Sequence, residues 1–179
     1  TLAPLGHTVE GLLIDGKRPD FNEPKELGLE PVAEAKILQA LTLIEGTELE
    51  GSAILVEDSG IFLDAFPNWP GAESSDVEKE IGLSGIIEKV NKSEIRGAEF
   101  RAVAILSDGP NFWKSTGVCR GSISHEIKGQ KGFGYDPIFI PSEGDGRTFG
   151  ELGAEVKNQI SHRKKAMQGL SNLLKSPSR

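Results

Sequence analysis

The feature that most constrains the fold is a strand-rich stretch in the second half of the chain. Residues 98–106 and 112–120 are two runs rich in apolar, β-branched and aromatic side chains, and the sequence Asp108-Gly109-Pro110 separates them. This pattern is typical of two antiparallel strands that are joined by a tight turn. A further run at residues 122–127 continues the strand character. The chain must therefore build a sheet, and its helices must pack against that sheet.

Two segments on either side of this stretch have helical spacing. Pro31 suits a first helical turn, and apolar side chains then recur every three to four residues until Gly46 ends the pattern. Near the end of the chain, Ser161 can cap a helix whose apolar residues are spaced by four, at Ala166, Leu170 and Leu174. Both helices are predicted to bury one face.

The remaining elements are shorter. We expect strands at 9–14, 53–56 and 61–63, with the last two meeting at an acidic turn, and a helix from about residue 77 that Ser75 or Asp76 caps. The order of these elements predicts a single α/β domain with a mixed sheet.

Composition excludes several classes of function. The formal net charge of −7 and the pI near 5.1 argue against a general polyanion binder, because such proteins carry a surplus of Lys and Arg. Cys119 is the single cysteine, so no internal disulfide can form and a reducing compartment is expected. No apolar run approaches the length of about 20 residues that a membrane span needs. The sequence predicts a cytoplasmic protein that binds neither nucleic acid polymers nor membranes.

The first candidate for chemistry is the acidic sequence at residues 57–60. Glu57 and Asp58 follow a buried apolar run, and two adjacent carboxylates at the end of a strand need a counter-charge, such as a divalent cation. Glu23 and Glu26, in the polar loop before the first helix, are possible further ligands. The alternative is a solvated acidic turn, which this motif alone favours equally.

A second candidate is the stretch Gly132–Pro141. Gly132 and Gly134 permit a flat ligand to approach the backbone, Phe133 or Tyr135 can stack on it, and Asp136 can accept hydrogen bonds from ring N–H groups. The alternative is a glycine-rich turn that leads into a strand with aromatic residues in the core.

A third candidate is the donor-rich run at residues 157–165. Its side chains and the free backbone N–H groups of a helix N-terminus suit carbonyl or phosphate oxygens. Cations are slightly unfavourable at a helix N-terminus, which favours a functional reason over a merely solvated basic end.

Taken in order, five motifs resemble the inosine triphosphate pyrophosphatase family. They are Val56–Gly60, Trp69-Pro70-Gly71, Gly132–Phe139, Thr148–Glu151 and Lys157–Arg163, and they cover nearly the whole chain. The resemblance implies a two-lobed α/β fold around a long central mixed sheet flanked by helices, with a nucleotide cleft between the lobes. It also implies a homodimer and Mg²⁺-dependent hydrolysis of XTP, ITP and dITP to the nucleoside monophosphate and pyrophosphate.

The resemblance also assigns roles to residues. Asp58 would be the catalytic carboxylate, and Glu26, with Glu23 as its rival, would join Glu57 and Asp58 at the metal. Lys36, with Gln39 as the alternative, would face the phosphates. The remaining substrate-binding residues would be Ser59, Phe133, Gly134, Tyr135, Asp136, Lys157, Ser161, His162 and Arg163.

Two departures from the family pattern accompany this assignment. The family opens with a strand and a Ser/Thr-Gly-Asn-x-x-Lys phosphate loop, and residues 1–179 form a single domain that starts after that point. Glu73 also stands where the family commonly has Tyr. The alternative function is therefore a catalytically impaired homologue that binds nucleotides without turning them over.

Overall fold

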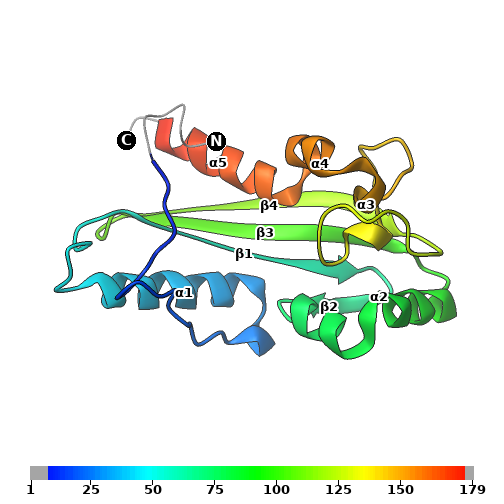
Figure 1. The fold of residues 1–179 in the computed structure, drawn as a ribbon, viewed down its shortest axis with the longest axis horizontal. Helices are drawn as coiled ribbons and strands as arrows, with labels where there is room; N and C mark the ends of the chain where they lie inside the picture. Colours follow the sequence, from blue (N-terminus) through cyan, green and yellow to red (C-terminus); the bar gives the residue numbers. More distant parts are fainter. Residues whose placement is uncertain (1–7, 176–179) are drawn as a thin grey trace.

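The computed structural model describes residues 8–175, which form one sheet of five strands covered by helices (Figure 1). The strand order is β2-β1-β3-β4-β5. Their bounds are Ile54–Leu63 for β1, Phe66–Gly71 for β2, Gly97–Ser107 for β3, Phe112–Ile123 for β4 and Phe139–Pro141 for β5. The predicted hairpin is confirmed, because β3 and β4 pair in register from Gly97 opposite Ser122 to Ser107 opposite Phe112.

The α/β class with helices against the sheet is confirmed, but the sheet is not mixed in the described part. All four strand pairings among residues 8–175 are antiparallel. The short connection at residues 108–111 can join only antiparallel neighbours, since a parallel pair needs a long crossover.

Alternation along β3 explains how helices cover both faces of the sheet. Val103 and Ile105 pack in one cluster with helix α1, Leu29–Ile44. Ala102 and Ala104 point to the other face and pack against helix α5, His162–Lys175. The small alanine side chains let α5 lie close to the sheet, and both predicted helices are confirmed (Figure 1).

The largest buried cluster lies toward the other end of the sheet. Helix α2, Ser74–Ser93, contributes aliphatic residues to it, and Phe139 and Phe149 are fully buried there. Phe149 belongs to the short helix α3, Phe149–Leu152, which is followed by α4, Ala154–Ile160. Two 3-10 turns, η2 at Lys25–Leu27 and η3 at Asp136–Ile138, precede α1 and β5 respectively.

Three predicted boundaries are wrong. Residues 9–14 form no strand and contribute only an isolated bridge between Ile14 and Lys17. Residues 122–127 are not a separate strand, because β4 continues to Ile123 and then ends. Helix α2 begins at Ser74, after Glu73, and no side chain caps it.

The most consequential correction concerns the acidic motif. The expected turn at residues 57–60 does not exist, because β1 runs unbroken from Ile54 to Leu63 and Asp58 pairs with Val103 of β3. Gly60 is required where β2 returns against β1, because a Cβ there would lie 2.0 Å from the carbonyl oxygen of Gly71.

One edge of β1 is only partly paired. Strand β2 pairs with Ile61–Leu63 alone, so the edge of residues 54–60 that faces away from β3 has no strand partner within residues 8–175. In the same part of the chain, no helix has the length and apolarity that a bilayer crossing would require.

Candidate functional site

The strand geometry of β1 splits the acidic motif between the two faces of the sheet. Successive side chains of a strand point to opposite faces. Glu57 and Ser59 therefore face α5, where Arg163 Nε lies 3.1 Å from Glu57 Oε2 and Arg163 Nη2 donates to Ser59 Oγ at 3.0 Å. Asp58 faces α1, where Lys36 Nζ donates to its Oδ1 at 2.8 Å. The structure does not bring Glu57 and Asp58 together.

Lys36 lies between two carboxylates. Its ammonium group is 2.8 Å from Asp58 Oδ1 and 2.7 Å from Glu23 Oε1. Glu26, the other glutamate of the loop, is not part of this cluster and lines a separate polar hollow beside Pro70. Of the two rival glutamates, the structure thus brings Glu23 to Asp58.

Burial controls the electrostatics of this cluster. Burial raises the pKa of the Asp58 carboxyl, and the hydrogen bond from Lys36 opposes this rise without cancelling it. Burial works to lower the pKa of Lys36, but hydrogen bonds to Asp58 and Glu23 outweigh it and the pKa lies above its ordinary value. Burial also acts to raise the pKa of Glu23, yet Lys36 lowers it overall. A cation held between two carboxylates shows that this cluster suits positive charge.

The cluster can supply only part of a metal coordination shell. Within residues 8–175 there is no group of three or more His, Cys, Asp or Glu side chains arranged to hold a metal ion. Mg²⁺ usually takes one or two protein carboxylates and fills its remaining positions with waters and phosphate oxygens. Asp58 and Glu23 fit that donor set.

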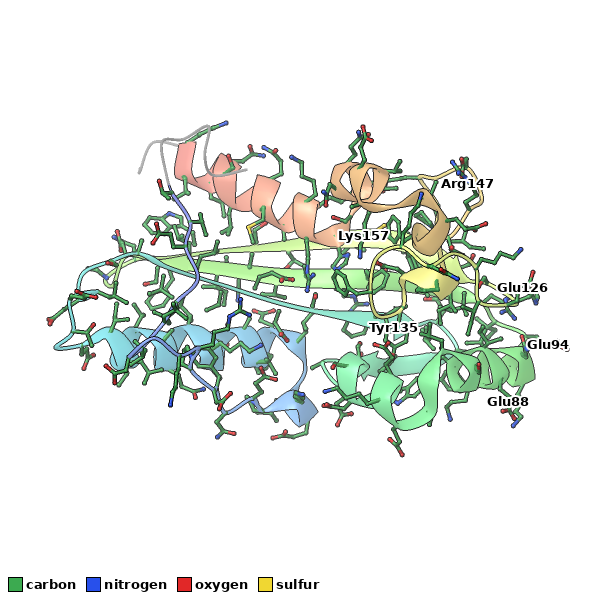
Figure 2. All side chains as sticks on the ribbon, viewed as in Figure 1. Glu88, Glu94, Glu126, Tyr135, Arg147 and Lys157 are labelled. Atoms are coloured by element: carbon green, nitrogen blue, oxygen red, sulfur yellow. The ribbon has the colours of Figure 1, made fainter. Side chains whose placement is uncertain are left out.

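A cavity of about 270 Å³ lies on the other face of β1. It collects eight of the side chains and backbone positions that were predicted to bind substrate: Ser59, Phe133, Gly134, Tyr135, Asp136, Lys157, His162 and Arg163. Figure 2 shows Tyr135, from the loop before η3, and Lys157, from α4, toward the same end of the sheet. We call this space the donor cavity.

Asp136 is the buried anchor of the donor cavity. The residue is 1 % exposed, and its Oδ2 accepts hydrogen bonds from Lys157 Nζ at 2.6 Å and from the backbone N–H of Phe133 at 3.0 Å. Its other oxygen, Oδ1, is buried and has no hydrogen-bond partner within residues 8–175. A buried acceptor of this kind is costly unless a ligand satisfies it.

The two aromatic residues of the motif have different surroundings. Phe133 is 64 % exposed, and the cations of Lys157 and Arg163 lie 4.2 and 5.4 Å from its ring centroid. Tyr135 is buried, and its hydroxyl donates to the backbone carbonyl of Ser74 at 2.9 Å. Phe133 is therefore the ring that is free to stack on a ligand.

His162 lines the donor cavity as a neutral side chain. It is 4 % exposed and stacks on Phe100 with ring centroids 4.7 Å apart. Burial, reinforced by the charges of Arg163 and Lys157, lowers the pKa of its imidazole to about 3. Its Nδ1 is buried and finds no hydrogen-bond partner in the described part of the chain. A neutral imidazole can offer one donor and one acceptor to a ligand.

Ser161 caps the N-terminus of helix α5. Its Oγ accepts a hydrogen bond from the backbone N–H of Lys164 at 3.2 Å, so the predicted N-cap of α5 is confirmed. The cap starts α5 where His162 and Arg163 enter the donor cavity.

Six residues line the donor cavity without having been predicted to bind substrate: Gly60, Ile61, Ser74, Ser75, Glu78 and Phe100. Ser74 and Glu78 come from α2, and Phe100 comes from β3. Ser74 follows the Trp-Pro-Gly motif closely enough to have been suspected, whereas Glu78 is one of several helix glutamates and nothing in the sequence marks it.

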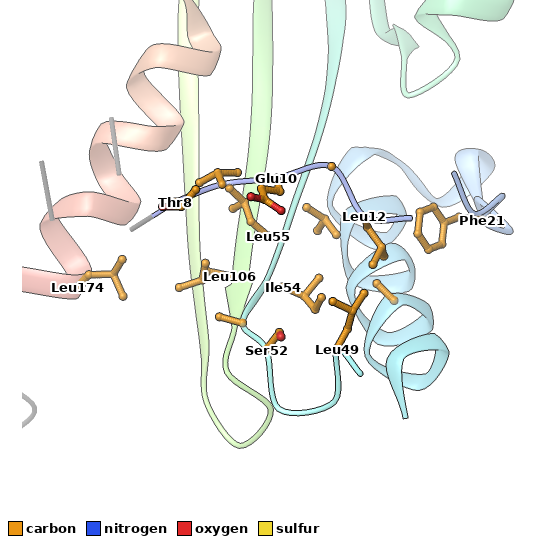
Figure 3. A pocket seen from close by; sticks show the side chains of 15 residues that line it. Thr8, Glu10, Leu12, Phe21, Leu49, Ser52, Ile54, Leu55, Leu106 and Leu174 are labelled. Atoms are coloured by element: carbon orange, nitrogen blue, oxygen red, sulfur yellow. The ribbon is translucent and has the colours of Figure 1, made fainter. Parts of the chain in front are cut away.

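A second cavity of about 410 Å³ lies beyond the other end of β1, between residues 8–12 and the ends of α1 and α5 (Figure 3). Its walls are largely aliphatic, with Leu12, Ile54 and Leu106 among them. A polar nucleotide would leave its phosphates without donors there, so this cavity is not the candidate site.

Comparison with known proteins places the chain in a family. Residues 3–173 match the sequence model of the Ham1 family. The chain belongs to the Ham1 family. A protein of Saccharolobus solfataricus called dITP/XTP pyrophosphatase is 42 % identical to this Ham1 chain over 123 residues. That alignment covers 69 % of this chain but 64 % of the relative, so the chain spans less than two thirds of that protein's length.

Solved structures agree with the fold of this Ham1 protein. The Ham1 protein of Staphylococcus aureus superposes with a TM-score of 0.75 and 27 % identity, covering 87 % of this chain and 80 % of that one. A nucleoside-triphosphatase / dITP/XTP pyrophosphatase of Mycobacterium abscessus reaches a TM-score of 0.67 at 32 % identity, covering 97 % and 90 %. The resemblance drawn from the five motifs is confirmed at the level of the family.

Proposed function

We propose that this Ham1 chain hydrolyses deaminated purine nucleoside triphosphates, namely XTP, ITP and dITP, to the monophosphate and pyrophosphate. The observation that carries the proposal is the pairing of two sites on adjacent residues of one strand. Ser59 lines the donor cavity, and Asp58 belongs to the carboxylate cluster with Glu23 and Lys36. The names of the relatives support the same reaction.

The partly paired edge of β1 supports a path for the ligand between these sites. The base would lie in the donor cavity against Phe133. The phosphates would cross the edge at residues 58–59, where no described strand pairs, and reach the other face of the sheet. This arrangement would correspond to the nucleotide cleft that the family resemblance implies.

Mg²⁺ is the proposed cofactor, and Asp58 and Glu23 would hold it. The ion would neutralise phosphate charge and make bound water more acidic. Glu57 forms an ion pair with Arg163 on the opposite face of the sheet, and Glu26 lies outside the cluster. We therefore propose neither as a metal ligand. Lys36 Nζ would move its hydrogen bonds from the carboxylates to phosphate oxygens.

We propose Asp58 as the catalytic carboxylate. In the free protein its Oδ1 accepts the Lys36 hydrogen bond. When Lys36 turns to the phosphates, one Asp58 oxygen would hold the ion and the other would take a proton from the attacking water. Burial raises the pKa of this carboxyl, and a more basic carboxylate is a better proton acceptor.

Selection of the base would rest on the carbonyl at position six. Hypoxanthine and xanthine present an acceptor there, whereas adenine presents an amino donor. Lys157, His162 and Arg163 can supply donors to that acceptor. Each buried donor left unpaired by adenine costs ~1 to 3 kcal/mol, so two or three mismatches would discriminate by orders of magnitude.

The decisive experiment measures pyrophosphate release with Mg²⁺ from ITP, XTP and ATP. We expect kcat/KM for ITP or XTP to exceed that for ATP by at least about 100-fold, and Asp58→Asn to lower it by at least about 100-fold. Asp64→Asn, at an exposed residue just after β1, is the matched control and should retain activity. Equal rates on ATP and ITP would contradict the proposal, and IMP binding without any turnover would favour a nucleotide-binding homologue instead.

Two further expectations accompany the proposed activity. The homodimer implied by the family resemblance is tested by sedimentation of the purified chain, and a cytoplasmic location stays a prediction from the cysteine content and charge.

A further inference from the structure

One carboxylate in the donor cavity has no partner. Glu78 lines the cavity from α2 and is half-buried, and within residues 8–175 it takes part in no hydrogen bond or ion pair. The other charged groups are matched, since Lys157 pairs with Asp136 and Arg163 pairs with Glu57. The wall formed by α2 therefore presents an uncompensated negative charge to whatever fills the cavity.

The Glu78 side chain lies close to the loop before η3. A Cβ built on Gly134 would lie 3.5 Å from Glu78 Oε2, so the carboxylate is in contact range of this stretch of the cavity wall. In Figure 1 this loop runs between α2 on one side and α3 and α4 on the other. A flat ring in the cavity would thus meet donors from α4 and α5 along one edge and the Glu78 carboxylate along another.

We propose that Glu78 is a specificity-determining residue that favours hypoxanthine over xanthine. This inference rests on the proposed function and names its preferred substrate. In the proposed orientation, with the carbonyl at position six toward Lys157 and His162, the edge between positions two and three would face α2. Xanthine carries a second carbonyl oxygen on that edge, and its nucleosides lose the N3 proton near neutral pH, which places negative charge there. Hypoxanthine carries a C–H group at position two and stays neutral.

The test compares ITP and XTP in steady-state kinetics at pH 7.5 for the wild type and Glu78→Gln. We expect the wild type to have a lower KM for ITP than for XTP. Glu78→Gln removes the charge and keeps the shape, so it should lower the KM for XTP about tenfold and change the KM for ITP less than about twofold. Glu80→Gln, an exposed glutamate of the same helix with the same charge change, should leave both constants unaltered.

Two outcomes would overturn the inference. An unchanged ratio of the KM values for XTP and ITP in Glu78→Gln would show that the carboxylate does not contribute to discrimination between the two bases. An equal change in Glu80→Gln would show a general effect of protein charge. Thermal melts of both variants establish that they fold.

A binding measurement separates this inference from the proposed function. Calorimetry with IMP and XMP reports the base preference without any turnover. If no variant releases pyrophosphate, the proposed function fails, while a tightening of XMP binding in Glu78→Gln alone would still support the role of Glu78. If turnover is present and the IMP to XMP preference is the same in all three proteins, only the inference about Glu78 fails.

Discussion

At the scale of single residues, the donor cavity contains polar groups that have no hydrogen-bond partner or counter-charge among the described residues. Asp136 Oδ1 and His162 Nδ1 are buried without partners, and the Glu78 carboxylate has no counter-charge among the described residues. Unsatisfied buried polar groups destabilise the free protein, which is why they mark a place where a ligand is expected to bind.

His162 yields a prediction for the pH dependence of stability. Its pKa is about 3 in the folded protein and about 6.5 in an unfolded chain. Between these values the unfolded state binds more protons, so stability falls as the pH is lowered below about 6.5. Urea denaturation of the wild type should show a loss in unfolding free energy between pH 7 and pH 5 that exceeds that of His162→Gln by about 2 kcal/mol.

The control for this measurement is His125→Gln, which changes an exposed histidine. It should follow the wild type at both pH values. If His162→Gln loses as much stability as the wild type over this range, the imidazole does not titrate as its burial requires.

At the scale of elements, the placement of α5 depends on a glycine in β4. A Cβ at Gly117 would lie 2.0 Å from the carbonyl oxygen of His162 and 2.3 Å from the backbone nitrogen of Ala166. The first turn of α5 therefore rests directly on the backbone of β4, and this close contact delivers His162 and Arg163 to the donor cavity.

Gly117→Ala should disturb this contact. Because backbone atoms of α5 cannot move aside locally, we expect a loss of about 1 to 3 kcal/mol in the free energy of unfolding together with weaker IMP binding. The matched control is Gly169→Ala on α5, where the new methyl group meets only the Ser115 side chain, whose hydroxyl can rotate away. Denaturant melts and calorimetry measure both quantities, and equal losses in the two variants would argue against the special role of Gly117.

At the scale of the whole molecule, the proposed ligand joins parts that are far apart in the sequence. The carboxylate cluster unites the loop at Glu23, helix α1 and strand β1, whereas the donor cavity unites β1 with α2, α4 and α5. Strand β1 is the element that the two sites share, and a ligand that contacts both should stabilise the fold more than a ligand that contacts one.

Thermal melts test this coupling. A non-hydrolysable ITP analogue with Mg²⁺ at about 100 times its Kd should stabilise the protein by about 2.7 kcal/mol, or about 5 to 10 °C in Tm. Inosine alone, at the same concentration as the analogue, should give a smaller shift in Tm. Glu23→Gln should reduce the shift that Mg²⁺ adds and Glu26→Gln should not, because Glu23 alone of the two lies beside Lys36 and Asp58. A reduction in Glu26→Gln only would reverse the assignment of the metal ligand.

The sequence by itself determined the kinds of elements and most residues of the donor cavity. The hairpin of β3 and β4, helices α1 and α5 and the Ser161 cap follow from local periodicity and turn chemistry, which act over a few neighbouring residues. The cavity residues from Phe133 to Asp136 and from Lys157 to Arg163 lie in two short motifs that can be read directly.

Only the tertiary structure decided how those residues are distributed between the two faces of the sheet. Asp58 and Ser59 are neighbours in sequence, and the sequence predicts an acidic turn there, but an unbroken β1 directs them to opposite faces. The choice of Glu23 over Glu26 and the presence of Glu78 in the donor cavity depend on the packing of loops and helices against β1. Such contacts join residues that are distant along the chain, so no local pattern in the sequence records them.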